Sequence, residues 1–270
     1  MNRLNGNRVS GVMRVRNLLT LIYFKSCAEL RSEAERTFAG FVWWILDPLF
    51  SLLIYYIVFS QISRIGNDPG SSSAFIHFLC VGIVFWGWMA NTVNRGANAI
   101  LLGAGIMQQV RLPKVIFPSS MVLTDTAKFG VVLLILVLVL LCSGCQMGLS
   151  YVALPFVLLC ELTFILGATF FVAAITPFFP DFRLFLAHGL QLLFFLSGVV
   201  IDLRFIPAPF GRWLSFNPMA VLMENFRLIL IHNEWPQWGA VGAVGLVSLA
   251  MAAGGAYVIH RNDTVYPKIC

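Results

Sequence analysis

The sequence predicts an all-α membrane protein, and three observations support this fold class. Hydrophobic residues make up 59% of the 270 residues, charged residues make up 11%, and long apolar runs recur along the chain. A membrane-spanning helix needs about 20 predominantly apolar residues, because the hydrocarbon core is roughly 30 Å thick. The apolar runs are continuous, whereas the strands of a membrane β-barrel alternate apolar and polar residues. We therefore expect a single helical membrane domain over residues 1–270, with no separate catalytic domain.

Six apolar runs predict six membrane-spanning helices. They cover residues 42–63, 74–94, 117–142, 151–176, 184–202 and 238–259. With this topology most Lys and Arg residues fall on the side of both termini, and only Arg64, Arg204, Arg212 and Arg227 fall on the other side. Because loops rich in Lys and Arg stay in the cytoplasm, both termini are expected to be cytoplasmic.

Residues 18–38, before the first run, predict an amphipathic helix. Their apolar residues recur at steps of three and four, as in Tyr23, Cys27 and Leu30, and charged residues fill the positions between them. Such a helix can lie in the membrane interface with its apolar side toward the lipid. The alternative is an ordinary solvated helix beside the membrane.

Two connecting segments are long enough to have functions of their own. Residues 96–113, between the second and third runs, predict a short cytoplasmic helix that ends before Pro113 and can dock on a partner. Residues 202–237 predict an external segment that prolines divide into short pieces. Its apolar run of residues 219–231 is too short to span a bilayer, so we expect a re-entrant or interfacial helix that caps an exit.

The chain lacks the common motifs for nucleotide, metal or hydrolytic chemistry. It contains no G-x-x-x-x-G-K-[ST], no H-E-x-x-H and no G-x-S-x-G, and its four histidines are scattered. We therefore expect no cofactor and no metal on this chain. The positive charges follow a membrane edge, which argues against nucleic acid as a partner. A membrane-embedded enzyme acting on lipid-linked sugars stays as an alternative, although its acidic residues would be dispersed.

Ionisable and thiol groups within the apolar runs allow more than one interpretation. Asp125 and Lys128 are three residues apart and can pair on one helix face. Glu161 has no local partner, so it is either functional or a hydrogen-bonded or protonated structural group. Cys142 and Cys145 have the spacing of a redox motif, and small residues at a helix end explain the same pattern.

Aromatic residues crowd the first two runs. Aromatic rings can stack against sugar rings, and they also form interfacial belts and pack helices together. The aromatic residues that we expect to line a substrate pathway are Trp43, Trp44, Tyr55, Tyr56, Phe59, Trp86 and Trp88.

Four segments, in order along the chain, resemble the inner-membrane permeases of polysaccharide exporters of the type-two ABC class. They are A-G-F-V-W-W-I-L-D-P before the first run, V-R-L-P-K-V-I-F-P before the third, F-F-P-D-F-R before the fifth, and I-P-A-P-F-G-R-W-L-S-F-N-P-M-A-V-L-M-E-N-F-R before the last. Together the similarity extends from about residue 18 to residue 260.

The resemblance implies a permease subunit that exports lipid-linked O-antigen or capsule polysaccharide across the bacterial inner membrane. It implies a homodimer of permeases with two copies of a separate ATPase, which would bind the ATP and Mg. The cytoplasmic loop would be a coupling helix with Ile100, Leu101, Ile106, Met107 and Arg111. The external segment would be a periplasmic gate with Pro207, Asn217, Pro218, Glu224 and Arg227. A permease for small drugs or lipids is the alternative within the same class.

Overall fold

The computed structural model describes residues 3–36, 42–63, 71–110, 112–200, 210–214 and 216–269, and in these residues every regular element is a helix. The helices before the long bundle are α1 (Arg3–Arg36) and α2 (Val42–Ser63). The remaining helices are α3 (Ser71–Ala97), α4 (Ala99–Leu102), α5 (Ala104–Gln109), α6 (Ile116–Cys142), the 3₁₀ helix η1 (Leu149–Ala153), α7 (Leu154–Ile175), α8 (Phe182–Leu196), α9 (Phe210–Leu214), α10 (Pro218–Leu230), α11 (Trp238–Arg261) and α12 (Tyr266–Ile269).

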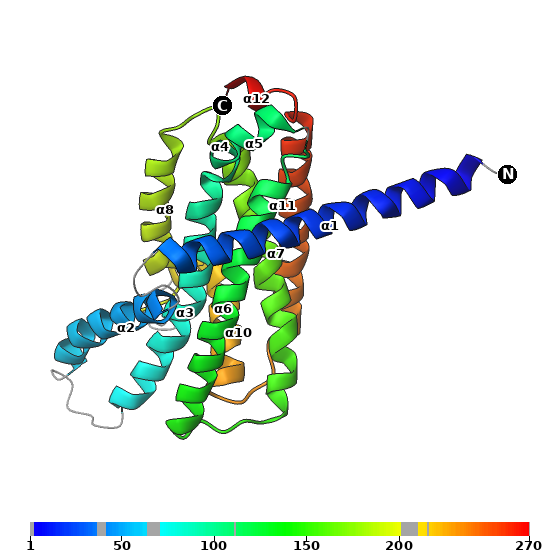
Figure 1. Ribbon diagram of the computed structural model, residues 1–270. Helices are drawn as coiled ribbons and strands as arrows, with labels where there is room; N and C mark the ends of the chain where they lie inside the picture. The colour runs from blue at the N-terminus through cyan, green and yellow to red at the C-terminus, as the bar shows by residue number, and fades with distance from the viewer. Residues whose placement is uncertain are drawn as a thin grey trace.

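Four helical segments of the described chain are long and apolar enough to cross a membrane. They are Ala74–Ala97, Ile116–Cys142, Leu149–Ile175 and Trp238–Arg261. These segments coincide with four of the six apolar runs, and they stand side by side as an upright bundle (Figure 1). The first run forms α2, which leans away from the bundle, and the fifth forms α8, which has only 15 residues. The four segments establish a multi-pass membrane protein.

The closest helix pairing in the bundle joins α7 to α11, and small residues make it possible. A side chain at Gly167 would meet the backbone of Ala252 at 2.8 Å, and one at Gly255 would meet Phe170 at 2.6 Å. Gly245 lies beside Cys160 in the same way. Residue numbers increase together along both helices, so α7 and α11 are parallel. The chain between them, residues 176–237, therefore runs from one end of the bundle to the other.

Aromatic side chains fill the core around α3. The ring of Phe85 stacks on Phe226 of α10 at a centroid distance of 3.8 Å and meets Phe129 of α6 edge-on. Trp88 stacks on the other side of Phe129, at 4.1 Å. Such pairs add about 0.5–1.5 kcal/mol each beyond the burial of their area. They fix α3 between α6 and α10.

Helix α1 is longer than the amphipathic segment expected at residues 18–38, and it crosses the bundle instead of running along it (Figure 1). Its carboxyl-terminal part packs on α6, where the Ser26 hydroxyl donates to the Ser120 carbonyl oxygen at 3.0 Å. Glu29 accepts hydrogen bonds from Ser120 and Thr124 of α6. Polar contacts thus fasten α1 across the first half of α6.

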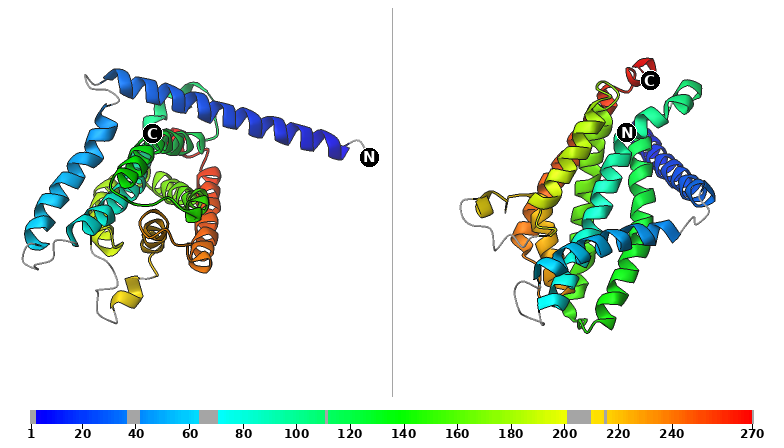
Figure 2. Two further views of the ribbon diagram at one scale, coloured as in Figure 1. Left: turned by 90° about the horizontal axis from the view of Figure 1, so that it is seen from below. Right: turned by 90° about the vertical axis from the view of Figure 1, so that its left-hand side faces the viewer.

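The fifth apolar run ends its helix early, and the helix expected near residues 219–231 is present as α10. Helix α8 ends at Leu196, six residues before the end of the apolar run, and Gly198 adopts a φ of 69° in the turn that follows. Helix α10 begins beside that turn and continues toward the end where α11 starts (Figure 2). Most residues of α10 are buried among α3, α7 and α11. The apolar run at 219–231 is therefore covered by protein.

Candidate transport pathway and coupling surface

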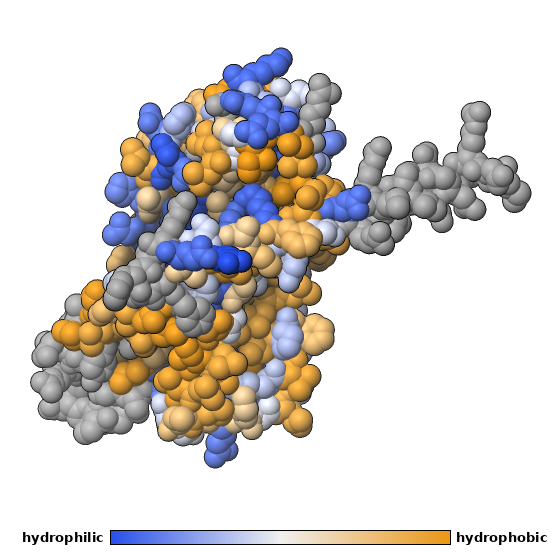
Figure 3. Space-filling model, in the orientation of Figure 1, coloured by the Kyte–Doolittle hydropathy of each residue, from blue (hydrophilic) through white to orange (hydrophobic). Residues whose placement is uncertain are grey.

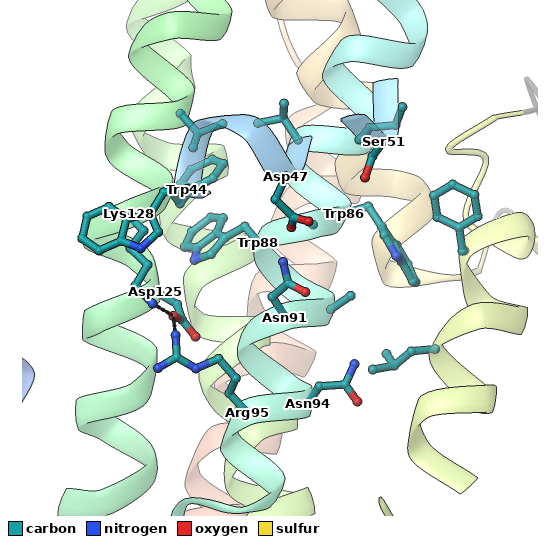
Figure 4. A pocket seen from close by; sticks show the side chains of 18 of the residues that line it. Trp44, Asp47, Ser51, Trp86, Trp88, Asn91, Asn94, Arg95, Asp125 and Lys128 are labelled. Atoms are coloured by element: carbon teal, nitrogen blue, oxygen red, sulfur yellow. Dashed lines mark hydrogen bonds and ion pairs between the residues drawn. The ribbon is translucent and has the colours of Figure 1, made fainter. Parts of the chain in front are cut away.

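A cavity of about 720 Å³ lies between α2, α3, α6 and α8. Four of the expected pathway residues line it, namely Trp43 and Trp44 from α2 and Trp86 and Trp88 from α3 (Figure 4). The side chains of the other three, Tyr55, Tyr56 and Phe59, lie outside the described residues. Trp86 meets Phe194 of α8 edge-on at 5.7 Å, so the cavity has aromatic walls on at least three helices.

Polar side chains occupy the space between the tryptophans, and sequence reasoning did not single them out. They are Asp47, Ser51, Asn91, Asn94 and Gln191. A signal for them was present, because Trp44, Asp47 and Ser51 recur at steps of three and four on one face of α2. Trp88, Asn91 and Arg95 recur in the same way on α3. Polar groups within a membrane bundle are costly unless they face protein or water, and here they face the cavity.

One end of the cavity is closed by four charged side chains from three helices. Arg95 of α3 forms ion pairs with Asp125 of α6 and with Glu33 of α1. Lys128 of α6 pairs with the same two carboxylates, and its distance to Asp125 is 3.1 Å. The pairing of Asp125 with Lys128 expected from their spacing is present. This four-residue charge cluster joins α1 to α3 and α6, two of the helices that line the cavity.

The charge cluster also touches the aromatic wall. The Lys128 ammonium lies 5.5 Å from the centroid of the Trp44 ring, within reach of a cation–π interaction. A movement of α1 that displaced Glu33 would therefore change the surroundings of both Lys128 and α2.

The loop between α3 and α6 folds into two short helices, and its predicted coupling residues divide into two groups. Ile100 and Met107 are buried among α6, α7 and the carboxyl-terminal segment, so they hold the loop in place. Leu101 is half-buried and Ile106 is exposed, whereas Arg111 lies outside the described residues. The large apolar side chains that the loop exposes are Leu102, Ile106 and Val110.

The carboxyl-terminal segment packs against this loop, which the sequence did not suggest. Tyr266 of α12 is fully buried in the same cluster as Ile100 and Met107, and its hydroxyl donates to the carbonyl oxygen of Ala174 at 3.3 Å. Asp263 accepts a hydrogen bond from the Lys114 backbone N–H at 3.0 Å. Hydrophilic residues gather over this end of the molecule and along α1 (Figure 3).

Two of the predicted gate residues, Asn217 and Arg227, contact the turn that follows α8. The Asn217 side chain accepts from the Met219 N–H, which caps α10, and donates to the Ser197 hydroxyl. Pro218 occupies the first turn of α10, where its missing N–H costs nothing. Glu224 is half-buried on α10, and Pro207 lies outside the described residues. Arg227 is buried and donates to the carbonyl oxygens of Gly198 and Val199.

Glu161 is completely buried in α7, and neither of its carboxyl oxygens has a hydrogen-bond partner among the described residues. It therefore differs from Asp125, whose carboxylate is held by Arg95 and Lys128. It does not line the cavity.

Cys142 and Cys145 are both free thiols at the end of α6. The helix stops in a turn in which Gly144 has a φ of 94° and the Cys145 N–H donates to Leu140. Burial raises the pKa of the Cys145 thiol, which is the opposite of the lowered pKa that marks reactive redox cysteines. The geometry agrees with helix termination by small residues.

Comparison with known proteins places the chain in a family. The family described as "ABC-2 type transporter" matches residues 21–231. An "O-antigen export system permease protein RfbA" of Myxococcus xanthus is 31% identical over 77% of this chain and 79% of its own length. A protein of the same description from Klebsiella pneumoniae is 23% identical over 78% and 80% of the two chains. The "Polysialic acid transport protein KpsM" of Escherichia coli is 26% identical over 74% and 76%.

The chain belongs to the ABC-2 type transporter family. It is a transporter subunit, and the ATPase activity that drives such a transporter is on a separate subunit. The matched region contains α2 to α10, and so it includes the cavity, the loop of α4 and α5, and the break after α8.

Proposed function

We propose that this chain is the membrane permease of an ATP-driven exporter of lipid-linked polysaccharide, of the O-antigen or capsule kind. The observation that carries the proposal is the tryptophan-lined cavity with polar groups between its rings, in a chain similar to O-antigen and polysialic acid transport proteins. Tryptophan faces stack on the apolar faces of sugars, and amide and carboxylate groups hydrogen-bond sugar hydroxyls. The named relatives favour polysaccharide over small drugs or lipids, and the dispersed acidic residues argue against an enzyme.

Six crossings are the topology that best accounts for the arrangement of the helices. Because α7 and α11 are parallel, the segment between them must return across the membrane once. Helix α8 covers the first part of this crossing and α10 covers the second part. Helix α2 supplies a further crossing before α3. Both termini are then on the cytoplasmic side, together with α4, α5 and α12, and α1 lies at the membrane surface. The hydrophilic surface at that end and along α1 supports this orientation (Figure 3).

A homodimer with two ATPase copies would complete the transporter. The cavity is bounded on one side by α2 and α8, and its carboxylate and amide groups would face lipid in a lone subunit. A second copy against this side would enclose a water-filled path. The exposed apolar residues Leu102, Ile106 and Val110 would meet the ATPase, and ATP-driven closure of the two ATPase copies would move the loop. Arg183 of α8 donates to Asn98 at 3.1 Å, which joins this loop to a cavity wall.

Deletion of this chain in its own host tests the function. Polysaccharide should disappear from the cell surface while lipid-linked polymer accumulates at the inner face of the membrane. Trp44→Ala and Trp86→Ala should lower export more than they lower the amount of membrane protein. Trp238→Ala, at an exposed tryptophan outside the cavity, is the matched control. Normal surface polysaccharide after the deletion would overturn the proposal.

Thiol labelling tests the topology. In a chain whose six native cysteines are replaced, single cysteines are introduced at Asn233 and at Gln109. An impermeant reagent outside the inner membrane should label position 233 and leave position 109 unlabelled. The reverse pattern would contradict the orientation.

A further inference from the structure

Among the described residues that line it, the cavity has no cation that is free to bind an anionic substrate. Its lining includes two basic residues, Arg95 and Lys128, and both are paired with Asp125 and with Glu33 of α1. These four charges sum to zero. Histidine is absent from the lining that the structure describes.

An additional negative charge stands beside the cluster. Asp47 of α2 is exposed to the cavity, and no ion pair within the described part of the chain neutralises it. Its carboxylate lies near Asn91 of α3, and the two groups stand between Trp88 and Trp86 (Figure 4). The cavity and its charge cluster thus contain three carboxylates and two cations. A polyanionic chain would meet repulsion here and would have no unpaired cation to contact.

The same groups suit the hydroxyl groups of an uncharged sugar. A carboxylate accepts hydrogen bonds from two adjacent hydroxyls, and amides such as Asn91 and Gln191 both donate and accept. Two buried polar atoms of the lining, Trp88 Nε1 and Asp125 Oδ2, have no partner among the described residues. Buried polar atoms normally have a hydrogen-bond partner, so these two mark the polar character of the cavity wall, while the exposed Asp47 carboxylate is the group that a sugar hydroxyl can reach.

We infer that the cavity is a subsite for uncharged glycans, in which Asp47 and Asn91 bind hydroxyl groups between the tryptophan rings, and that the Glu33 and Asp125 pairs make it reject anionic glycans. This inference rests on the proposed function and specifies its substrate class. It distinguishes this chain from a permease for an acidic polymer, although one relative is named for transport of polysialic acid.

Binding to the purified full-length chain in nanodiscs tests the inference. The probes are three oligosaccharides of seven sugars each: maltoheptaose and α-mannoheptaose, which are neutral, and an α2,8-linked sialic acid heptamer. Saturation-transfer NMR should show contact with a neutral heptamer and none with the sialic acid heptamer at the same concentration. Asp47→Ala and Asn91→Leu should each weaken binding of the neutral heptamer by about tenfold, the loss expected for a hydrogen bond to a charged or buried group.

Two further variants separate specificity from folding. Asp181→Asn removes an exposed carboxylate from the turn before α8, outside the cavity, and should leave binding unchanged. The double variant Asp47→Asn with Glu33→Gln raises the charge of the cavity by two and should gain binding of the sialic acid heptamer. Because this result is a gain, misfolding cannot produce it.

Each outcome decides the inference. Equal binding of neutral and anionic heptamers, binding of neither neutral probe, or unchanged binding in the Asp47 and Asn91 variants would each overturn it. If these results occur while deletion of the chain still abolishes surface polysaccharide, the subsite assignment fails and the export function stands. If surface polysaccharide is also normal after deletion, both fail.

Discussion

The guanidinium carbon of Arg227 lies 3.3 Å from the centroid of the Phe78 ring. The same guanidinium donates to Gly198 and Val199 at 2.8 and 3.0 Å, just after the last turn of α8. One side chain of α10 therefore joins the turn after α8 to α3, and it satisfies two backbone carbonyl groups of that turn.

Replacement of Arg227 by Lys should release this junction. Lysine keeps the charge but has no planar group that stacks on Phe78 and reaches two carbonyls together. We expect a loss of about 1.5–3 kcal/mol in the free energy of unfolding, the range for hydrogen bonds to charged groups. Thermal unfolding in nanodiscs measures it. Arg261→Lys, at an exposed arginine of α11, is the control, and equal stability of the two variants would contradict the assignment.

Loss of Glu29 should loosen α1 from the bundle. Its carboxylate accepts from Thr124 at 3.1 Å and pairs with Lys25, and both contacts disappear in Glu29→Ala. Limited proteolysis should then cut within α1 several times faster than in the wild type. The matched variant Glu35→Ala removes an exposed pair with Arg31 and should leave the rate unchanged. Protection that is identical in both variants would mean that apolar packing alone holds α1.

The exposed apolar residues of the coupling loop should transmit ATP hydrolysis. Leu102→Asp and Ile106→Asp should uncouple the two activities, because a carboxylate cannot be buried against a partner without a large cost. ATP hydrolysis by the assembled transporter should continue while export falls at least about tenfold, a cost of roughly 1.4 kcal/mol. Gln108→Asp, an exposed polar position of the same loop, should behave as wild type. Full export by both apolar-to-Asp variants would remove the loop from the coupling path.

Tyr266 should hold the coupling loop in position from α12. Tyr266→Ala empties a fully buried site and should cost about 3–5 kcal/mol. Hydrogen exchange should show the loss of protection in α4 and α5, which share its cluster. Tyr257→Ala, at an exposed tyrosine of α11, is the control. Loss of protection spread evenly over the bundle would indicate a general packing defect instead.

Glu161 and Asp125 should respond in opposite ways to replacement by leucine. A carboxyl group without a partner in a membrane span costs about 2.5–3.5 kcal/mol, so Glu161→Leu should stabilise the chain or leave its stability unchanged. Asp125→Leu leaves Arg95 and Lys128 with one carboxylate fewer and should destabilise it. Thermal unfolding of the two variants decides this, and destabilisation by Glu161→Leu would reveal a structural role for that carboxyl group.

The sequence predicted much of the helix content because long apolar runs have few structural alternatives. Composition could not show that α8 ends at Leu196, because the residues that follow it are equally apolar and the break depends on Gly198 and on Arg227 from a distant segment. Four tryptophans predicted for the pathway line the cavity, and the sequence could point to them because aromatic residues are conspicuous; their contact with substrate stays a prediction. Asp47 and Asn91 were not predicted as cavity residues. A single polar residue on one helix does not indicate a site, and the cavity is recognisable only once neighbouring helices place several polar side chains side by side.

The charge cluster shows a similar limit. The spacing of Asp125 and Lys128 predicted their local pair, whereas Arg95 and Glu33 reach it from helices that are distant in sequence. The buried Ile100 and Met107 could not be told from the exposed Ile106 because the loop consists of two separate short helices, so its residues do not follow one helical period.

The tight parallel packing of α7 on α11 also affects how the segment between them can change in length. Residues 176–237 join the two ends of one rigid helix pair, and α8 and α10 within them pack on the same bundle, so an insertion between Val200 and Phe210 lengthens only the connection from α8 to α9. Closure entropy grows only with the logarithm of loop length, and doubling a flexible loop costs roughly 0.6 kcal/mol. Such an insertion should therefore leave the stability of the bundle nearly unchanged.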